Sequence, residues 1–295
     1  MLNGRKGRVF MEVKKVGIVG SGIMGRGITE VGAVHGFEII LIDIDQSLLQ
    51  QARNTIEKSL LKQVHRERLS SEEFQRAIQN IHFSTDLTNL SEAQLIIEAV
   101  MENAENKRSL LTEIESVCKP DTILASNTSS ISISRLAQSL NHPERFIGMH
   151  FFNPVPKMKL VEVICGDKTS ESVVDAVFRI AQMMDKVPVK VKNCPGFIVN
   201  RLLIPMINEA AEILSDGIAS TQDIDTAMKL GANFPVGPLE LADLIGVDTC
   251  FAIMETLHED LDDSRYRPHP LLAQMVREGL IGKKSGKGFY EYKKA

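Results

Sequence analysis

The sequence contains no tryptophan and only three tyrosines among its 295 residues. With so few large aromatic rings on which bases could stack, a surface for single-stranded nucleic acid is not expected. The formal net charge of −4 argues against binding to a duplex. No apolar run approaches the roughly 20 residues that a membrane-spanning helix needs. We therefore expect small molecules and a second protein subunit as partners, with neither nucleic acid nor membrane.

The four cysteines, Cys118, Cys165, Cys194 and Cys250, are scattered and form no CxxC pair. This pattern is typical of a reducing compartment and predicts neither a disulfide framework nor a metal site. The basic opening "MLNGRKGRVF" has no apolar core and so differs from a secretory signal. It is either the remnant of a longer leader or, as we favour, a loose end. A cytoplasmic location is expected.

Up to about residue 192, short apolar runs alternate with amphipathic stretches of helical length. Seven runs are predicted strands: 15–20, 38–43, 94–100, 122–127, 145–151, 159–164 and 187–192. The first several are almost continuously apolar, as in a parallel sheet whose two faces are both covered by helices. The succession of strand and helix predicts the α/β class, with a doubly wound, Rossmann-type sheet.

Two features interrupt this alternation. Residues 45–80 are predicted to form a helical hairpin inserted after the second strand, with a turn near "RLSSEE", where Ser70 and Glu73 make a capping box. After "NCPGF" the strand pattern ends, and the remaining chain has the spacing of helices. We therefore expect two domains, residues 1–193 and an all-helical domain of residues 194–295.

The segment "VGIVGSGIMGRG" places Gly20, Gly22 and Gly25 in GxGxxG spacing after an apolar strand. In a dinucleotide site, the first glycine allows a tight turn and the second a close approach to pyrophosphate. The third allows close packing of helix on strand. The pyrophosphate would lie at the helix N-terminus, which favours an anion. Asp43 follows as a ligand for the ribose hydroxyls, and its charge favours NAD over NADP. Glycines that serve only a turn are the alternative.

His150 lies in the apolar and conformationally stiff segment "GMHFFNPVP". In the strand "KLVEVI", Glu162 shares a face with Leu160 and Ile164, where a carboxylate is costly unless it is paired. His150 is a natural partner, and a histidine steadied by a carboxylate accepts protons near neutral pH. A structural His–Glu pair in the core remains the alternative.

Two further polar segments stand where a ligand site is expected. "ASNTSSISI" ends a strand in five small polar residues, 126–130, and ligands bind at strand ends in doubly wound sheets. Helix capping is the alternative for these hydroxyls. "CPGFIVNRLL" places Asn200 and Arg201 at the start of the helical domain. An ordinary amide on a helix face is the alternative for Asn200.

Six segments in this order and spacing, "GSGIMG", "SNTSS", "HFFNPVP", "KLVEV", "PGFIVNR" and "GKKSGKGFY", resemble the 3-hydroxyacyl-CoA dehydrogenases. In length the chain is most similar to the bacterial 3-hydroxybutyryl-CoA dehydrogenases. The resemblance implies an oxidoreductase that interconverts (S)-3-hydroxyacyl-CoA, of short chain such as 3-hydroxybutyryl-CoA, and 3-oxoacyl-CoA by hydride transfer to or from NAD. It implies a place in fatty-acid oxidation or butanoate metabolism. It also implies that the first domain binds NAD, and that the second binds substrate and forms a homodimer.

The resemblance also implies roles for single residues. His150 corresponds to the catalytic base and Glu162 to the carboxylate that orients it, while Ser129 and Asn200 contact the substrate near its reacting carbon. The implied cofactor contacts are Gly20, Ser21, Gly22, Ile23, Met24, Gly25, Asp43, Glu102, Lys107, Ser129, Asn153 and Lys284. Ser59 and Arg66 match positions that contact coenzyme A, although Arg66 stands where some members have lysine.

Lys58, Lys62 and Arg66 stand at i, i+4 and i+8, which predicts one basic stripe on a helix for the phosphates of coenzyme A. An ordinary solvated face is the alternative for this stripe. Two other functions stay open. One is a dehydrogenase of free 3-hydroxyacids, which would use a lysine base where this chain has Asn200 and Arg201. The other is a non-catalytic, crystallin-like NAD-binding protein.

Overall fold

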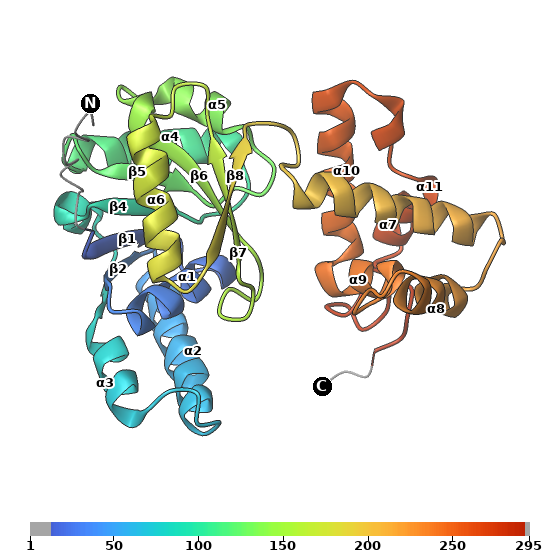
Figure 1. The fold of residues 1–295 in the computed structure, drawn as a ribbon, viewed down its shortest axis with the longest axis horizontal. Helices are drawn as coiled ribbons and strands as arrows, with labels where there is room; N and C mark the ends of the chain where they lie inside the picture. Colours follow the sequence, from blue (N-terminus) through green and yellow to red (C-terminus); the bar gives the residue numbers. More distant parts are fainter. Residues whose placement is uncertain (1–12, 293–295) are drawn as a thin grey trace, which may run out of the picture. The chain divides into compact units, whose positions relative to one another are not determined.

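The computed structural model describes residues 13–292, which form two compact units (Figure 1). The first unit ends at Asn193 and the second begins at Cys194. All named strands of the described residues belong to the first unit, whereas the second is helical. The predicted α/β class with a helical C-terminal part is therefore confirmed. The opening segment 1–10, predicted to be a loose end, lies outside the described residues.

Eight strands form one sheet in the order β3-β2-β1-β4-β5-β6-β7-β8. Their bounds are β1 Lys15–Val19, β2 Glu38–Ile42, β3 Ile81–Ser84, β4 Leu95–Glu98, β5 Ile123–Ser126, β6 Phe146–Phe151, β7 Leu160–Cys165 and β8 Val187–Lys192. All neighbouring strands are parallel except β6 and β7, which are antiparallel. The apolar runs predicted every strand except β3, a four-residue edge strand in which only Ile81 is buried.

The sheet is the core of the first unit because its central strands consist mostly of buried apolar residues. Ile18, Ile39, Leu41 and Ile97 have no exposed surface. The helices around it are α1 Ile23–Val34, α4 Ala104–Val117, α5 Ile133–Leu136 and α6 Glu171–Met183, with 3-10 turns η1 Leu87–Glu92, η2 Ala137–Ser139 and η3 Pro143–Arg145. In Figure 1, α6 crosses one face of the sheet.

The predicted hairpin insertion consists of α2 (Gln46–Val64) and α3 (Ser71–Gln79), which extend away from the sheet (Figure 1). The capping box is confirmed, since the Ser70 hydroxyl accepts a hydrogen bond from the Glu73 amide and the Glu73 carboxylate accepts one from the Ser70 amide. The predicted basic stripe was wrong for Arg66, which lies beyond the end of α2. The helix stops there because Glu67 adopts a left-handed conformation with φ of 55°.

From residue 194 to residue 292, the second unit contains five helices and one 3-10 turn: α7 Val199–Ser215, α8 Thr221–Gly231, α9 Pro238–Ile245, α10 Val247–Leu261, η4 Ser264–Tyr266 and α11 Pro270–Arg277. The segment "GKKSGKGFY" folds onto Asp243 of α9, whose carboxylate accepts hydrogen bonds from the amides of Phe289 and Tyr290, both at 2.9 Å. A Cβ atom on Gly288 would lie 1.9 Å from this carboxylate. Only glycine fits at that position without a rearrangement.

None of the helices within residues 13–292 combines the length and the apolar character that crossing a membrane requires. Across the same residues, histidine, cysteine, aspartate and glutamate side chains form no group of three that could hold a metal ion.

Candidate active site

The glycine loop follows β1 at the carboxyl edge of the sheet. Gly20 has φ of 105°, and a Cβ there would lie 2.7 Å from the backbone oxygen of Ala99. A Cβ on Gly25 would lie 1.8 Å from the oxygen of Gly20, so this glycine lets α1 pack against the turn. Around Gly22 there is nothing within 4 Å of the position of a Cβ. The backbone at Gly22 is therefore open to a ligand.

Helix α1 begins directly after this loop, at Ile23. It has neither a side-chain cap nor an acidic residue in its first turn. Its N-terminal amides and dipole therefore favour an anion such as a pyrophosphate. Asp43 follows β2 and accepts hydrogen bonds from both the amide and the hydroxyl of Ser21, each at 2.6 Å. The loop and the carboxylate are thus held together in an arrangement that fits a dinucleotide with unmodified ribose hydroxyls.

His150 and Glu162 stand directly opposite each other on the antiparallel strands β6 and β7. The Nδ1 atom of His150 lies 2.8 Å from Oε2 of Glu162, and their relative exposures are 6% and 1%. The ring of Phe152 packs against the imidazole, with 4.4 Å between the ring centroids. Because Nδ1 is engaged by the carboxylate, proton exchange with a ligand would take place at Nε2.

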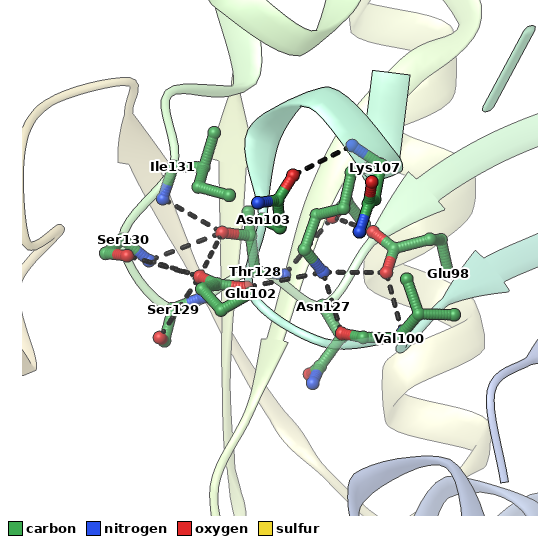
Figure 2. A network of polar contacts seen from close by, with 12 residues as sticks. Glu98, Val100, Glu102, Asn103, Lys107, Asn127, Thr128, Ser129, Ser130 and Ile131 are labelled. Carbon is green, nitrogen blue, oxygen red and sulfur yellow. Dashed lines mark hydrogen bonds and ion pairs between the residues drawn. The ribbon is translucent and has the colours of Figure 1, made fainter. Parts of the chain in front are cut away.

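The polar loop after β5 surrounds the carboxylate of Glu102 (Figure 2). The Oε1 atom accepts hydrogen bonds from the Thr128 hydroxyl at 2.5 Å and from the Ser129 amide at 2.8 Å. The amide and hydroxyl of Ser130 also donate to it. Burial by itself would raise the pKa of Glu102, but the Lys107 ammonium and these hydrogen bonds lower it below its ordinary value. Glu102 is therefore ionised, and its hydrogen bonds fix the conformation of the loop that carries Ser129.

Lys107 joins Glu102 to a second carboxylate, Glu98 at the end of β4 (Figure 2). Its Nζ atom lies 2.7 Å from Glu98 and 3.3 Å from Glu102, and it donates to the oxygen of Val100 at 3.1 Å. The side chains of Lys107 and Glu98 are 1% and 0% exposed. Glu98 also accepts from the Ser126 hydroxyl at 2.6 Å. Buried charges of this kind are tolerated only when they are paired and hydrogen-bonded.

Asn127 connects the serine loop to the strand that bears His150. Its Oδ1 atom accepts a hydrogen bond from the amide of Phe151 at 2.9 Å. The ends of β5 and β6, where Ser129 and His150 are expected to meet a substrate, are therefore tied together by one buried amide.

A pocket of about 360 Å³ lies between the first turns of α1, the end of α2 and the loop after β6. It brings together three predicted contact residues, Ser59, Arg66 and Asn153, and it is also lined by Ile23, the first residue of α1. Of the predicted basic stripe, Lys62 and Arg66 line this pocket. Their positive charges suit the phosphates of a nucleotide.

Met24 lies in the first turn of α1, and the last two predicted residues belong to the second unit. Asn200 lies in the first turn of α7 with 9% of its surface exposed. Lys284, in the segment folded onto Asp243, pairs with Asp248 at 2.6 Å.

Two family models match consecutive parts of the chain. The 3-hydroxyacyl-CoA dehydrogenase, NAD binding domain, covers residues 15–194, and the 3-hydroxyacyl-CoA dehydrogenase, C-terminal domain, covers residues 196–292. The chain belongs to the 3-hydroxyacyl-CoA dehydrogenase family. This confirms the resemblance of the six sequence segments, and with it the dependence of this oxidoreductase on NAD.

Individual relatives of this 3-hydroxyacyl-CoA dehydrogenase are similar over nearly their whole length. A probable 3-hydroxybutyryl-CoA dehydrogenase of Deinococcus radiodurans is 47% identical over 278 residues, which cover 94% of this chain and 100% of that protein. Human mitochondrial hydroxyacyl-coenzyme A dehydrogenase is 41% identical over 288 residues, covering 95% of this chain and 92% of that protein. The crystal structure of (S)-3-hydroxybutyryl-CoA dehydrogenase from Ralstonia eutropha superposes with a TM-score of 0.94 at 45% identity, covering 96% of this chain and 100% of the other.

Sequence reasoning missed several buried groups of this dehydrogenase. Glu98 carries the same signal that identified Glu162, namely a carboxylate within an apolar strand, and could have been found in that way. Asn127 was included only as one of five small polar residues. Glu30 resembles an ordinary residue of a helix face, because nothing in "RGITEVG" indicates that α1 turns this side chain toward the hairpin.

Proposed function

We propose that this 3-hydroxyacyl-CoA dehydrogenase interconverts (S)-3-hydroxybutyryl-CoA and acetoacetyl-CoA with NAD, and that His150 and Glu162 form its acid–base pair. The observation that carries the assignment of the pair is the buried contact of 2.8 Å between His150 Nδ1 and Glu162. The preference for a short chain is supported by the names of the similar relatives from Deinococcus and Ralstonia.

In the oxidative direction, Nε2 of His150 takes the proton of the C3 hydroxyl while the hydride leaves C3. The C3–H and O–H bonds break and a C=O bond forms, which gives 3-oxoacyl-CoA. NAD supplies the hydride acceptor when it is bound. Glu162 stabilises the imidazolium that forms and keeps Nε2 directed at the substrate. In the reductive direction, the same nitrogen returns the proton.

The remaining roles concern orientation. Ser129 holds the substrate oxygen and Asn200 holds the acyl group. These contacts raise the rate by orienting the substrate, and neither residue exchanges a proton with it. Glu102 and Lys107 order the loop on the nicotinamide side, and Lys284 contacts the cofactor. The glycine loop and Asp43 hold the pyrophosphate and the adenine-side ribose. Asn153 also contacts the cofactor, and Ser59 and Arg66 bind the coenzyme A part of the substrate.

Residues 1–193 act as the NAD-binding domain in this proposal, and residues 194–295 bind substrate and form a homodimer. Large apolar side chains exposed on the second unit support the dimer, since Leu202, Ile218 and Leu230 are 71%, 70% and 82% exposed. Sedimentation at micromolar concentration should then show a dimer rather than a species of 32.7 kDa. The four free cysteines support a cytoplasmic location.

The His150→Gln variant tests the acid–base assignment. It should bind NADH with wild-type affinity and lose about 10²- to 10⁴-fold in turnover of acetoacetyl-CoA, as expected for a general acid–base residue. His142→Gln, which changes an exposed histidine of the same unit, is the matched control and should retain full turnover. Wild-type turnover in His150→Gln would remove this residue from the mechanism.

Substrate comparison tests the acyl-CoA assignment. The wild-type enzyme should oxidise (S)-3-hydroxybutyryl-CoA and show no comparable activity with free 3-hydroxybutyrate. The opposite preference would favour a free-acid dehydrogenase. A protein that binds NADH but reduces no acetoacetyl-CoA would favour a non-catalytic role.

A further inference from the structure

Glu30 of α1 is a buried carboxylate in the pocket between α1 and the hairpin. It is 5% exposed, and among the described residues that line this pocket it is the only acid, whereas five are lysine or arginine. The pKa of Glu30 is raised above its ordinary value, because the effect of burial exceeds that of the hydrogen bonds from Ser59 and Gln63, which lower it. A buried carboxylate beside an expected phosphate site needs an explanation, since it repels the phosphates.

The two hydrogen bonds to Glu30 fix the direction of two neighbouring polar groups. The Ser59 hydroxyl and the Gln63 amide nitrogen lie 2.9 Å and 2.6 Å from the same oxygen, Oε1. A carboxylate cannot donate, so both neighbours must donate to it. The single proton of Ser59 is thereby committed to Glu30, and the amide of Gln63 has its nitrogen toward Glu30 and its carbonyl oxygen turned away.

Ser59 therefore offers only acceptor lone pairs to a ligand. Phosphate oxygens are acceptors as well, so they are the wrong partner for this hydroxyl and the right partner for Arg26, Lys62 and Arg66, which line the same pocket. What fits Ser59 together with the outward-turned carbonyl oxygen of Gln63 is a group that donates two hydrogen bonds. The nucleotide end of coenzyme A carries two kinds of donor, the 2′-hydroxyl of the ribose and the exocyclic amino group of adenine, and only the amino group has two hydrogens.

We propose that Glu30 is a positioning residue that turns Ser59 and Gln63 into acceptors, and that these recognise the adenine amino group of coenzyme A. This inference rests on the proposed function, because it concerns the substrate of the same enzyme. Glu30 acts through its two neighbours and takes no part in the chemistry at C3. It makes the pocket selective for the base, while the cations bind the phosphates.

The test compares acetoacetyl-CoA with its analogue in which hypoxanthine replaces adenine, so that a carbonyl oxygen stands in place of the amino group. The wild-type enzyme should prefer the adenine compound by about 10-fold in kcat/KM, the effect of one mispaired buried hydrogen bond. In Glu30→Gln the carboxamide both donates and accepts hydrogen bonds. The Ser59 hydroxyl can then rotate, accept from residue 30 and donate to the ligand. The preference should fall below about 3-fold, and the loss with acetoacetyl-CoA should appear in KM rather than in kcat.

Glu113→Gln, at an exposed position of α4, is the matched control and should keep the full preference for adenine. Acetoacetyl-pantetheine has no base, so Glu30→Gln and Glu113→Gln should reduce it with equal kcat/KM. A wild-type enzyme that does not distinguish the two bases would overturn the proposal, and that comparison requires no variant. An undiminished preference in Glu30→Gln would also overturn it. Failure of the wild-type enzyme to reduce any of these thioesters would instead refute the proposed function.

Discussion

The Lys107→Met variant should destabilise the first unit, because it leaves Glu98 buried without its counter-charge. Methionine preserves most of the side-chain volume, so packing should contribute little to the loss. Removing one partner of a buried ion pair costs about 3–5 kcal/mol. Glu98 would keep its hydrogen bonds from the Val100 amide at 2.7 Å and from Ser126 at 2.6 Å. These two donors place the expected loss at the lower end, about 3 kcal/mol.

Equilibrium unfolding in urea, followed by circular dichroism, measures this loss. The double variant Lys107→Met/Glu98→Gln removes the uncompensated charge and should recover about 2 kcal/mol relative to Lys107→Met alone. Lys119→Met is the matched control, since Lys119 pairs with Glu92 on the surface and its loss should cost less than about 1 kcal/mol. The reasoning would be refuted if Lys107→Met cost no more than this control, or if the double variant were no more stable than Lys107→Met.

Two further perturbations test stabilising contacts, one within each unit. Gly288→Ala should cost about 2–3 kcal/mol of unfolding free energy, because its Cβ would overlap Asp243, and Gly231→Ala, which meets nothing within 4 Å, should be nearly neutral. A thermal melt in which the two variants coincide would contradict this. Glu115 contributes stability that is lost on acidification: burial raises its pKa, but the amides of Asn141 and His142 and the Arg145 guanidinium outweigh this and lower it below 4.5. The stability difference between wild type and Glu115→Gln should therefore be full at neutral pH and shrink as the pH falls below 4.5, and a difference independent of pH would contradict the assignment.

The sequence was most informative where a charged side chain stood among apolar residues. Glu162 on an apolar strand face predicted a partner, and β6 and β7 indeed place His150 directly opposite it. The glycine spacing likewise predicted a tight turn followed by a helix. Strand β3 escaped prediction because a short edge strand buries too little to show an apolar run.

What could not be predicted are contacts between elements that no local pattern relates. Arg66 leaves the helical stripe because the chain turns at Glu67, which is not a residue typical of left-handed turns. The pairing of Lys107 with Glu98 depends on how α4 returns to the end of β4. The contact of Glu30 with the hairpin depends on the angle between α1 and α2, which the sequence does not encode locally.

The antiparallel pairing of β6 with β7 has a consequence for how the site forms during folding. His150 and Glu162 are only 12 residues apart, while Ser21 and Asp43 are 22 apart and Glu102 and Ser129 are 27 apart. By loop-closure entropy alone, closing the 12-residue segment costs about 0.5–0.7 kcal/mol less than closing either of the other two. The acid–base pair is therefore the most local of these three contacts, whereas the other two join strands that pair in parallel and depend on the sheet being formed.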